Sequence, residues 1–375
     1  MPFRTIAALA LAGFFIFASA CTPGNSTDLA ATTSEAQPSS STDSLWFEGE
    51  RRLSNIRQLT FGGNNAEAYW SPDGDQLVFQ SDYEGINAQG CDQIFVMNAD
   101  GSNIGESRYQ LASTGDGRTT CGYFLPDGRV LYASTHEANS QCPAPVFAAA
   151  GRYVWPIYPT YDIYAANADG SGVTKLIGGE GYDAEATVSP DGKYVVFTST
   201  RSGDLELWRY DLATGEVLQL TDALGYDGGA FFSPDSKQIV WRASRPQGDE
   251  ATVYRELLAD DKVEPSALNL FVANIDGSNA RQVTDLPGAN WAPFFHPDGK
   301  RIVFTTNHHM VNTNPRVFDI FIVNLDGSRL EQVTQSGVFD GFPMFSPDGS
   351  QIAFSSNRNA PEEGSTNVFV ADWVD

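Results

Sequence analysis

The chain is poor in basic residues, and this shortage limits its possible partners. Its 375 residues include 23 Lys and Arg against 47 Asp and Glu, which gives a formal net charge of −24. Nucleic acids and anionic membrane surfaces are bound through clusters of Lys and Arg, so the balance argues against both as partners. It is compatible with solubility alone, or with cations and basic partners.

Familiar catalytic motifs are missing as well. The sequence has no Gly-x-Ser-x-Gly elbow, as a propeller-gated serine peptidase would need, and no Gly-x-x-x-x-Gly-Lys-Ser/Thr phosphate loop. It has no Cys-x-x-Cys pair, and His136-Glu137 is not followed by the second histidine of a His-Glu-x-x-His zinc motif. We therefore assign no catalytic residue, expect no cofactor, and favour a binding protein over an enzyme.

The apolar run near the start is too short to span a membrane comfortably. Residues 6–20 follow Arg4 and end in Ala18-Ser19-Ala20-Cys21. This ending resembles a bacterial lipobox, in which the cysteine is diacylated before cleavage in front of it. We expect a lipoprotein signal peptide over residues 1–20 and lipidation at Cys21; the alternative is ordinary secretory cleavage beside an unrelated cysteine.

The segment after Cys21 is rich in Ser, Thr, Ala and Pro and has no apolar period, so residues 21–52 are expected to form a flexible tether. Thr22 is not an aspartate, which by resemblance to Gram-negative lipoproteins favours the outer membrane. We expect a lipid-anchored protein of the bacterial cell envelope, at the periplasmic side or the surface of the outer membrane. The leaflet and the oligomeric state stay open.

One phrase recurs six times in the rest of the chain: a Pro-Asp turn, with Gly in five copies, between two apolar segments. Successive copies start 54, 64, 44, 63 and 50 residues apart. A period of this size built from short strands is typical of a β-propeller with one blade per repeat. The six copies are Ser71–Gly74, Leu125–Gly128, Ser189–Gly192, Ser233–Ser236, His296–Gly299 and Ser346–Gly349.

Each repeat predicts four antiparallel strands, and counting them closes a ring. A fourth-strand phrase, Arg57-Gln58-Leu59-Thr60, comes before any Pro-Asp turn, and the last repeat ends at Asn367–Ala371 with no fourth strand after it. Asn55–Thr60 should therefore supply the outer strand of the final blade, because open sheet edges at both ends would favour aggregation. The sequence predicts an all-β, six-bladed propeller over residues 53–375 with four-stranded antiparallel blades.

These repeats resemble those of the TolB-like propeller family. The resemblance covers roughly residues 55–373 and rests on strand–Ser-Pro-Asp-Gly–strand, on runs such as Phe354-Ser355-Ser356, and on Asn-x-Asp-Gly turns. The TolB family carries an α/β domain before its propeller, whereas this chain has only a short linker there. The resemblance implies protein–protein contacts with envelope partners, or retention of an extracytoplasmic peptide or saccharide over the channel.

Three further cysteines, Cys91, Cys121 and Cys142, fall at one face of the predicted ring. In an exported, oxidising setting one disulfide can form and one thiol is left over. The sequence does not choose the pair.

Long loops also gather at that face, and loops on a rigid scaffold often carry function. Aligning the repeats by their turns places two columns of polar residues there. The first column, at the entry to the innermost strands, is Asn65, Thr119, Asp183, Asp227, Asn290 and Asp340, with Glu67 and Glu185 two places further on. The second column, just after the second strands, is Tyr83, His136, Arg201, Arg245, His308 and Arg358.

Three interpretations of these columns stay open. The Asp and Asn side chains can cap loop amides while Arg201 and Arg358 pair with the nearest Asp. Alternatively, the Arg and His residues, with Asp183, Glu185, Asp227 and Asp340, form a ligand site suited to carboxylates. The weakest interpretation is a metal held by His136, His308 and His309 with Asp183, Asp227 or Asp340.

We therefore expect an envelope-anchored propeller that acts as a protein- or ligand-binding or scaffolding module. The alternative is a carbohydrate-active enzyme, a lyase or hydrolase, because oligogalacturonate lyases resemble this propeller family and use a metal-bound histidine cluster. The fourth histidine, His296, stands in the Ser position of a Pro-Asp-Gly turn on the opposite face and is expected to be a turn residue.

Overall fold

The structure is a computed structural model that describes residues 45–144, 152–360, 362 and 364–375. The expected signal peptide, the lipidation site Cys21 and most of the expected tether lie outside these residues. No helix in the described ranges is both long and apolar enough to cross a membrane.

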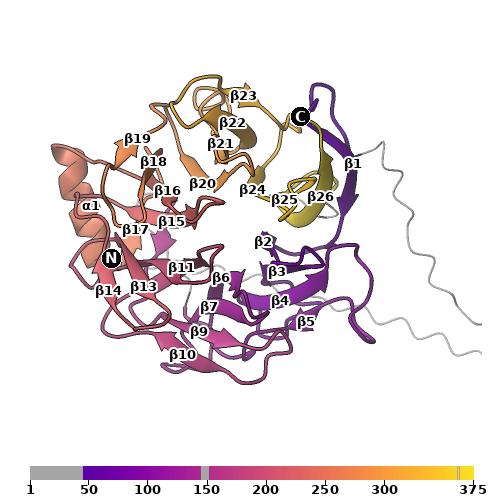
Figure 1. Ribbon diagram of the computed structural model, residues 1–375, viewed down its shortest axis with the longest axis horizontal. Coiled ribbons are helices and arrows are strands. Elements are labelled where there is room, and N and C mark those ends of the chain that lie inside the picture. The colour runs from indigo at the N-terminus through magenta and orange to yellow at the C-terminus, as the bar shows by residue number, and fades with distance from the viewer. Residues whose placement is uncertain (1–44, 145–151, 361, 363) are drawn as a thin grey trace, which may run out of the picture. The chain divides into compact units, whose positions relative to one another are not determined.

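Six four-stranded antiparallel sheets surround a central axis, with β2, β6, β11, β15, β20 and β24 innermost (Figure 1), as the sequence predicted. Blade 1 comprises β2 (Asn65–Trp70), β3 (Gln76–Ser81), β4 (Gln93–Asn98) and β5 (Gln110–Leu111). Blade 2 comprises β6 (Thr119–Phe124), β7 (Val130–Ser134), β9 (Asp162–Ala166) and β10 (Thr174–Ile177). Blade 3 comprises β11 (Asp183–Val188), β12 (Tyr194–Ser199), β13 (Glu206–Asp211) and β14 (Val217–Gln219).

The other half of the ring repeats the pattern. Blade 4 comprises β15 (Asp227–Phe232), β16 (Gln238–Ala243), β18 (Asn269–Asn274) and β19 (Arg281–Gln282). Blade 5 comprises β20 (Asn290–Phe295), β21 (Arg301–Thr306), β22 (Asp319–Asn324) and β23 (Glu331–Gln332). Blade 6 comprises β24 (Asp340–Phe345), β25 (Gln351–Ser356), β26 (Asn367–Trp373) and β1 (Leu53–Gln58). The second strands are almost wholly buried, because neighbouring blades cover both of their faces.

Blade 6 joins the two ends of the folded region. β1 pairs antiparallel with β26, from Leu53 opposite Trp373 to Gln58 opposite Phe369 (Figure 1). This confirms the predicted closing strand.

The propeller also reaches further toward the N-terminus than the expected tether boundary allows. Leu45 and Glu50 are buried, and both bind the Arg358 guanidinium, Leu45 through its carbonyl oxygen at 3.0 Å. Residues 45–52 thus pack on blade 6, where Leu45 joins the apolar core and Glu50 provides a countercharge for Arg358.

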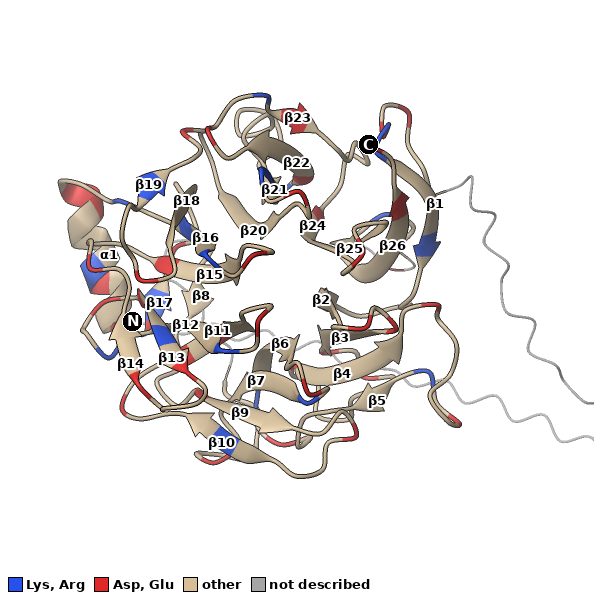
Figure 2. Cartoon of the chain, viewed as in Figure 1, with Lys and Arg blue, Asp and Glu red and all other residues tan. Residues whose placement is uncertain are grey.

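The four turns that begin Ser-Pro-Asp close through the same contacts. In blade 1 the Ser71 hydroxyl donates to the Asp73 carboxylate at 2.6 Å and accepts from the Gln76 amide at 2.9 Å, while Gly74 takes a φ of +80°. In blade 5 His296 fills the serine position, and its Nδ1 lies 3.1 Å from the Asp298 amide, so its predicted role as a turn residue is confirmed. Figure 2 shows these acidic turns recurring around the axis.

Two opposite faces of the ring follow from this topology. We call the face with the Pro-Asp turns the turn face, and the face with the loops between second and third strands the loop face. One loop-face insertion, in blade 4, contains the single helix of the described residues, α1 (Asp249–Ala259).

Removing the closing strand should destabilise the whole ring. We predict that a chain starting at Phe61 unfolds at a much lower temperature than one starting at Leu45. It loses the buried side chains of Leu53, Ile56 and Leu59, each worth about 2 kcal/mol on burial. Thermal unfolding followed by circular dichroism measures the difference, and equal melting temperatures would refute the closure.

Candidate functional site

A bulge repeats in all six innermost strands and directs one side chain from each blade toward the axis. The register between first and second strands shifts in every blade, as between Ala184 and Thr187 in blade 3. The third residue of each inner strand lies in this shift with a positive φ between 46° and 59°. These six residues, which we call the bulge ring, are Glu67, Cys121, Glu185, Gly229, Ala292 and Phe342.

Aromatic side chains close the channel below the bulge ring. Tyr69 of blade 1 lies 5.4 Å from Phe231 of the opposite blade 4, centroid to centroid, and both contact Tyr123. Phe294 of blade 5 completes the cluster at 5.4 Å from Phe231. Such edge-to-face contacts are favourable for aromatic rings. The channel is therefore a blind cavity that opens only toward the loop face.

Two insertions form an arch over the cavity. β8 (Trp155–Pro156) of the blade 2 insertion pairs with β17 (Lys262–Val263) of the blade 4 insertion. Arg152 and Glu264 form an ion pair at 2.7 Å beside this two-stranded sheet. The Trp155 ring lies 5.9 Å from Trp291 and 5.3 Å from the Arg242 guanidinium. The arch thus reaches from blade 2 to the walls of blades 4 and 5.

The resulting cavity has a volume of about 1470 Å³. Its floor includes Tyr69, Thr187 and Phe231, and all six bulge-ring residues line it. Further aromatic residues that line it are Trp155, Tyr158, Tyr161, Tyr182, Tyr226, Trp291, Phe318, Phe339 and Phe342. An apolar cavity with a few fixed polar groups is the usual form of a ligand site.

Glu185 is a cavity carboxylate with four polar partners. Its carboxylate accepts hydrogen bonds from Thr198 Oγ1 at 2.7 Å, the Tyr226 hydroxyl at 2.6 Å and the Gly229 amide at 3.0 Å, and it forms an ion pair with Arg242. Burial alone would raise the pKa of Glu185, but Arg242 and these hydrogen bonds outweigh it and hold the pKa below its usual value. Glu185 therefore stays ionised and links blades 3 and 4.

Arg242 reaches this position through a gap in blade 4. It belongs to a second strand, and the inner strand in front of it carries Gly228 and Gly229 in succession. A Cβ at Gly229 would overlap the Arg242 guanidinium, and one at Gly228 would overlap the Glu185 carboxylate. The missing side chain at Gly229 thus leaves room for the guanidinium to reach the cavity, and that at Gly228 leaves room for the Glu185 carboxylate. Sequence analysis named Glu185 but missed Arg242, and the Gly-Gly pair was the signal that could have found it.

Glu67 and Cys121 are the other polar members of the bulge ring. Burial raises the pKa of Glu67 to about 7, and contact with the Cys121 thiol lowers it less than burial raises it. Among the residues that the structure describes, Glu67 has no ion-pair partner. Cys121 is a free thiol, and burial raises its pKa as well.

The arginines of the second sequence column are held inside the blades. Arg201 pairs with Asp183 at 2.7 Å, Arg245 pairs with Asp227 through both nitrogens at 2.7 and 2.8 Å, and Arg358 pairs with Asp340 at 3.0 Å. Each guanidinium also stacks on an aromatic ring of its own blade: Phe197 and Trp208, Phe271, and Phe354, respectively. The predicted pairing of Arg201 and Arg358 with the nearest Asp is confirmed. These charges already have partners, so the geometry favours the structural interpretation of the column over a ring of ligand-binding cations.

The first column differs from the expected amide caps. Asn65 and Asn290 donate their side-chain amides to loop carbonyl oxygens, for example Asn65 to Gly62 at 2.7 Å, rather than accepting from loop amides. The six residues of this column are at most 1% exposed. They fix the loops at the entry to the inner strands from inside the protein.

The histidines lie apart. His136 of blade 2 packs against Tyr164 at 4.3 Å, whereas His308 of blade 5, on the opposite side of the ring, packs against Phe321 at 4.7 Å. His309 bonds instead to Asp319, with Nε2 2.8 Å from the carboxylate. Within the described residues no group of three or more His, Cys, Asp or Glu side chains is placed to hold a metal ion.

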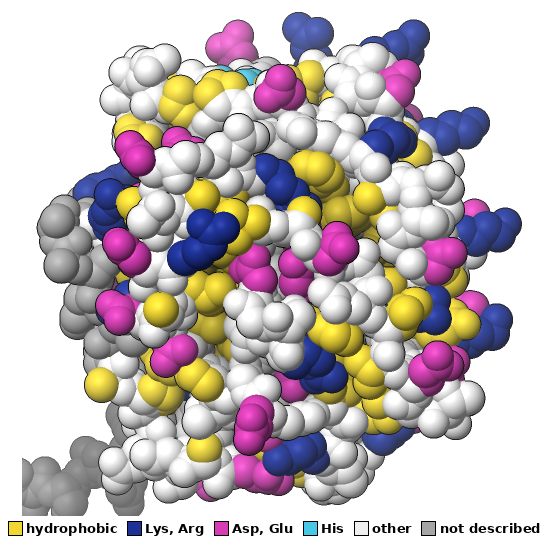
Figure 3. Space-filling view, turned by 90° about the vertical axis from the view of Figure 1, so that its left-hand side faces the viewer, with side chains coloured by type: hydrophobic (Ala, Val, Ile, Leu, Met, Phe, Trp, Pro, Cys, Tyr) yellow, Lys and Arg dark blue, Asp and Glu magenta, His cyan; other side chains and the backbone are white. Residues whose placement is uncertain are grey.

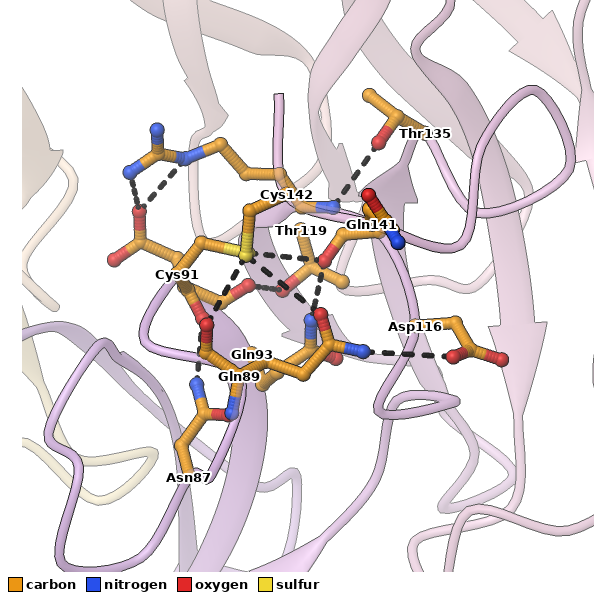
Figure 4. Close-up of a disulfide and its surroundings, with 12 residues drawn as sticks. Asn87, Gln89, Cys91, Gln93, Asp116, Thr119, Thr135, Gln141 and Cys142 are labelled. Carbon is orange, nitrogen blue, oxygen red and sulfur yellow. Dashed lines mark hydrogen bonds and ion pairs between the residues drawn. A yellow bond between two sulfur atoms is a disulfide. The ribbon is translucent and has the colours of Figure 1, made fainter. Parts of the chain in front are cut away.

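Of the three cysteines whose pairing the sequence does not decide, two form a disulfide. Cys91 of blade 1 is bonded to Cys142 of blade 2, with the Cα atoms 5.9 Å apart (Figure 4). Beside it, Gln93 donates to the Gly117 carbonyl oxygen at 2.8 Å, and the Thr119 hydroxyl donates to the Asp92 carbonyl oxygen at 3.0 Å. The disulfide ties two neighbouring loops of the loop face and leaves Cys121 free in the cavity.

The fold and site define a six-bladed propeller with a blind central cavity, and the comparisons with known proteins agree. Residues 258–373 match the family model described as the TolB beta propeller domain. A putative TolB from Agrobacterium tumefaciens aligns with a TM-score of 0.54 and 17% identity over 85% of this chain and 97% of that one. TolB from Acinetobacter baumannii aligns with a TM-score of 0.53 and 16% identity over 83% and 64%. Residues 258–373 therefore match a TolB-type propeller domain, and the described residues share the propeller fold of these TolB structures.

Curated relatives match shorter stretches. An uncharacterised protein of Agrobacterium fabrum is 28% identical over 149 residues, which are 38% of this chain and 46% of that protein. Dipeptidyl-peptidase 5 of Porphyromonas gingivalis is 40% identical over 65 residues, 17% of this chain and 9% of the peptidase. The chain thus spans less than half the length of the curated relatives it matches.

A structural role for Arg358 has a measurable consequence. Its side chain is fully buried, so Arg358→Ala leaves Asp340 and Glu50 buried without their countercharge. We predict a loss of about 3–5 kcal/mol of unfolding free energy in urea denaturation. Lys237→Ala, at a side chain that is 79% exposed on the turn face, is the control and should change stability by less than about 0.5 kcal/mol. Unchanged stability of the Arg358 variant would contradict the structural role.

Glu206 gives a pH-dependent prediction. It begins β13, burial raises its pKa to about 8, and its Oε2 has no hydrogen-bond partner. Between pH 4.5 and 8 the folded state holds a proton that the unfolded state has lost, so this group makes stability fall as pH rises. We expect Glu206→Gln to remove up to about 1.4 kcal/mol per pH unit from that slope. Urea denaturation from pH 5 to 8 measures it; a slope matching that of the exposed control Glu180→Gln would contradict the assignment.

Proposed function

We propose that the chain is a binding protein of the bacterial cell envelope whose blind cavity holds a segment of a partner protein or an extracytoplasmic peptide. The observation that carries this proposal is the cavity itself, closed below by aromatic rings and spanned above by the arch. Its volume of about 1470 Å³ exceeds the roughly 300–1000 Å³ usual for small-molecule sites, so it has room for several residues of a chain.

The composition of the cavity supports binding rather than catalysis. Its fixed charges, Glu185 with Arg242 and Asp92 with Arg118, are already paired, as suits groups that orient a ligand by hydrogen bonds. The arch places Tyr153, which is 72% exposed, at the mouth, where an amphipathic ring can contact an arriving chain.

The alternative of a carbohydrate-active lyase or hydrolase has less support. It needs His136 and His308 to act together with carboxylates, yet these residues pack on opposite blades, each against an aromatic ring. A saccharide ligand held without catalysis remains compatible with the aromatic walls and is one outcome of the test below.

The envelope location rests on the N-terminal sequence. The apolar run and Cys21 support export and lipid anchoring, which would make the anchor the only membrane contact that we propose. The surface agrees with the absence of a nucleic-acid partner: on the side shown in Figure 3, acidic and basic side chains are interspersed and form no continuous basic area.

Site-specific photocrosslinking in the envelope tests the proposal. A benzophenone amino acid at position 153 should give a discrete adduct, whereas the same group at Lys237 on the turn face should not. Trp155→Ala, which removes the ring above Arg242, should weaken the adduct at position 153 without unfolding the chain. Mass spectrometry identifies the captured molecule as protein, peptide or glycan. Identical adduct patterns at the two positions would contradict a binding site at the loop face.

A further inference from the structure

The cavity wall is chemically divided between two halves of the ring. Blades 1–3 contribute Glu67, Cys121 and Glu185 to the bulge ring, whereas blades 4–6 contribute Gly229, Ala292 and Phe342. The second half is extended by aromatic packing, because Phe342 lies 4.8 Å from Trp291, and Trp291 stacks on Phe339 at 6.1 Å. The bulge ring is therefore polar in blades 1–3 and small or apolar in blades 4–6, where Trp291 and Phe339 extend the apolar side.

Among the acidic residues that line the cavity, one has no ion-pair partner in the described chain. Glu185 is neutralised by Arg242, and Asp92 by Arg118 at 2.6 Å. Glu67 is the acidic wall residue without an ion-pair partner among the described residues. A ligand that supplies a positive charge would pair with Glu67; Arg316, which is exposed, also lines the cavity without an ion-pair partner among the described residues.

Aromatic rings line the same cavity as this carboxylate. Tyr69, two residues further along β2, forms the floor below Glu67, and Trp155 of the arch already receives the Arg242 guanidinium at 5.3 Å from its ring. A carboxylate close to aromatic faces provides both a charge-assisted hydrogen bond and cation–π attraction for an ammonium group.

We propose that the cavity selects an amphiphilic cation, with a primary ammonium group at Glu67 and an apolar body against Trp291, Phe339 and Phe342. The inference deepens the proposed function and rests on it. Two sources carry this chemistry: the free amino terminus of a chain and a lysine side chain beside an apolar residue.

The charge state of Glu67 makes this selection pH-dependent. The groups that face it are Cys121 from β6, Glu185 from β11, Arg242 from β16 and Asp92 from the loop before β4, with Tyr69 on its own strand. With a pKa of about 7, Glu67 is mostly protonated at pH 6 and mostly ionised at pH 8. A lysine ammonium keeps its charge over this range, so its affinity should rise about tenfold from pH 6 to pH 8.

Three tryptophan-free peptide amides test the inference on the full chain: Phe-Gly-Gly with a free amino terminus, its N-acetylated form, and acetyl-Lys-Phe. Binding is followed by the fluorescence of Trp155 and Trp291, which line the cavity. At pH 7 the free peptide should bind at least about tenfold more tightly than the acetylated one. Glu67→Gln should abolish this preference, whereas Glu84→Gln, an exposed residue of the same blade, should retain it.

The three peptides distinguish the possible outcomes. If acetyl-Lys-Phe amide binds and depends on Glu67, the site recognises ammonium groups in general; if only free Phe-Gly-Gly amide does, it recognises an amino terminus. Both results support the inference. Equal affinities of the free and acetylated peptides overturn it and leave the binding cavity in place. Absence of binding by all three, together with no adduct at position 153, overturns the proposed function as well.

Discussion

The pairing of β1 with β26 is the constraint on which the rest of the structure depends. Without it, blade 6 would have three strands and an open edge, and the contacts between blades 1 and 6, such as Trp70 Nε1 to the Met344 carbonyl oxygen at 3.1 Å, would have to close the ring alone. The pairing is reinforced by Glu50, which binds the buried Arg358 of the same blade at 2.9 Å. Once the ring is closed, the direction of every inner strand is fixed, and so is the axis toward which the bulge ring points.

The bulge repeated in the six inner strands places equivalent residues of all blades at the central cavity. Because each inner strand adopts a positive φ at its third residue, six equivalent backbone positions line the cavity, and five of them carry a side chain. The backbone is alike in all six blades, so the chemistry depends only on which residue occupies the bulge. Glu67, Cys121 and Glu185 make one half of the bulge ring polar, and Gly229, Ala292 and Phe342 make the other half small or apolar. The glycines of blade 4 leave room for the Arg242 guanidinium beside Glu185.

The sequence predicts structural features that depend on neighbouring residues, but not those that join segments far apart in the chain. The turns, the blade number and the closing strand follow from short sequence motifs whose interactions involve only neighbouring residues. All of these features are found in the structure. The ion pairs of Arg201 and Arg358 could be predicted too, since antiparallel pairing brings positions at matching strand ends together. Features that join distant segments could not. β8 and β17 have two residues each, with no strand pattern, and pair across about a hundred residues of sequence. The choice of Cys91 and Cys142 likewise depends on how two loops approach each other.

The bulge ring lines the cavity in which we propose that the ligand binds, and Cys121 provides a direct probe of it. It is a free thiol of the described chain and lines the cavity, so a small neutral maleimide should reach it in the folded protein. The decisive measurement is its alkylation rate, followed by mass spectrometry of the Cys121 peptide with and without the captured partner. At about ten times Kd, the bound partner should slow alkylation about tenfold. An unchanged rate with the partner bound would show that ligands bind elsewhere on the propeller.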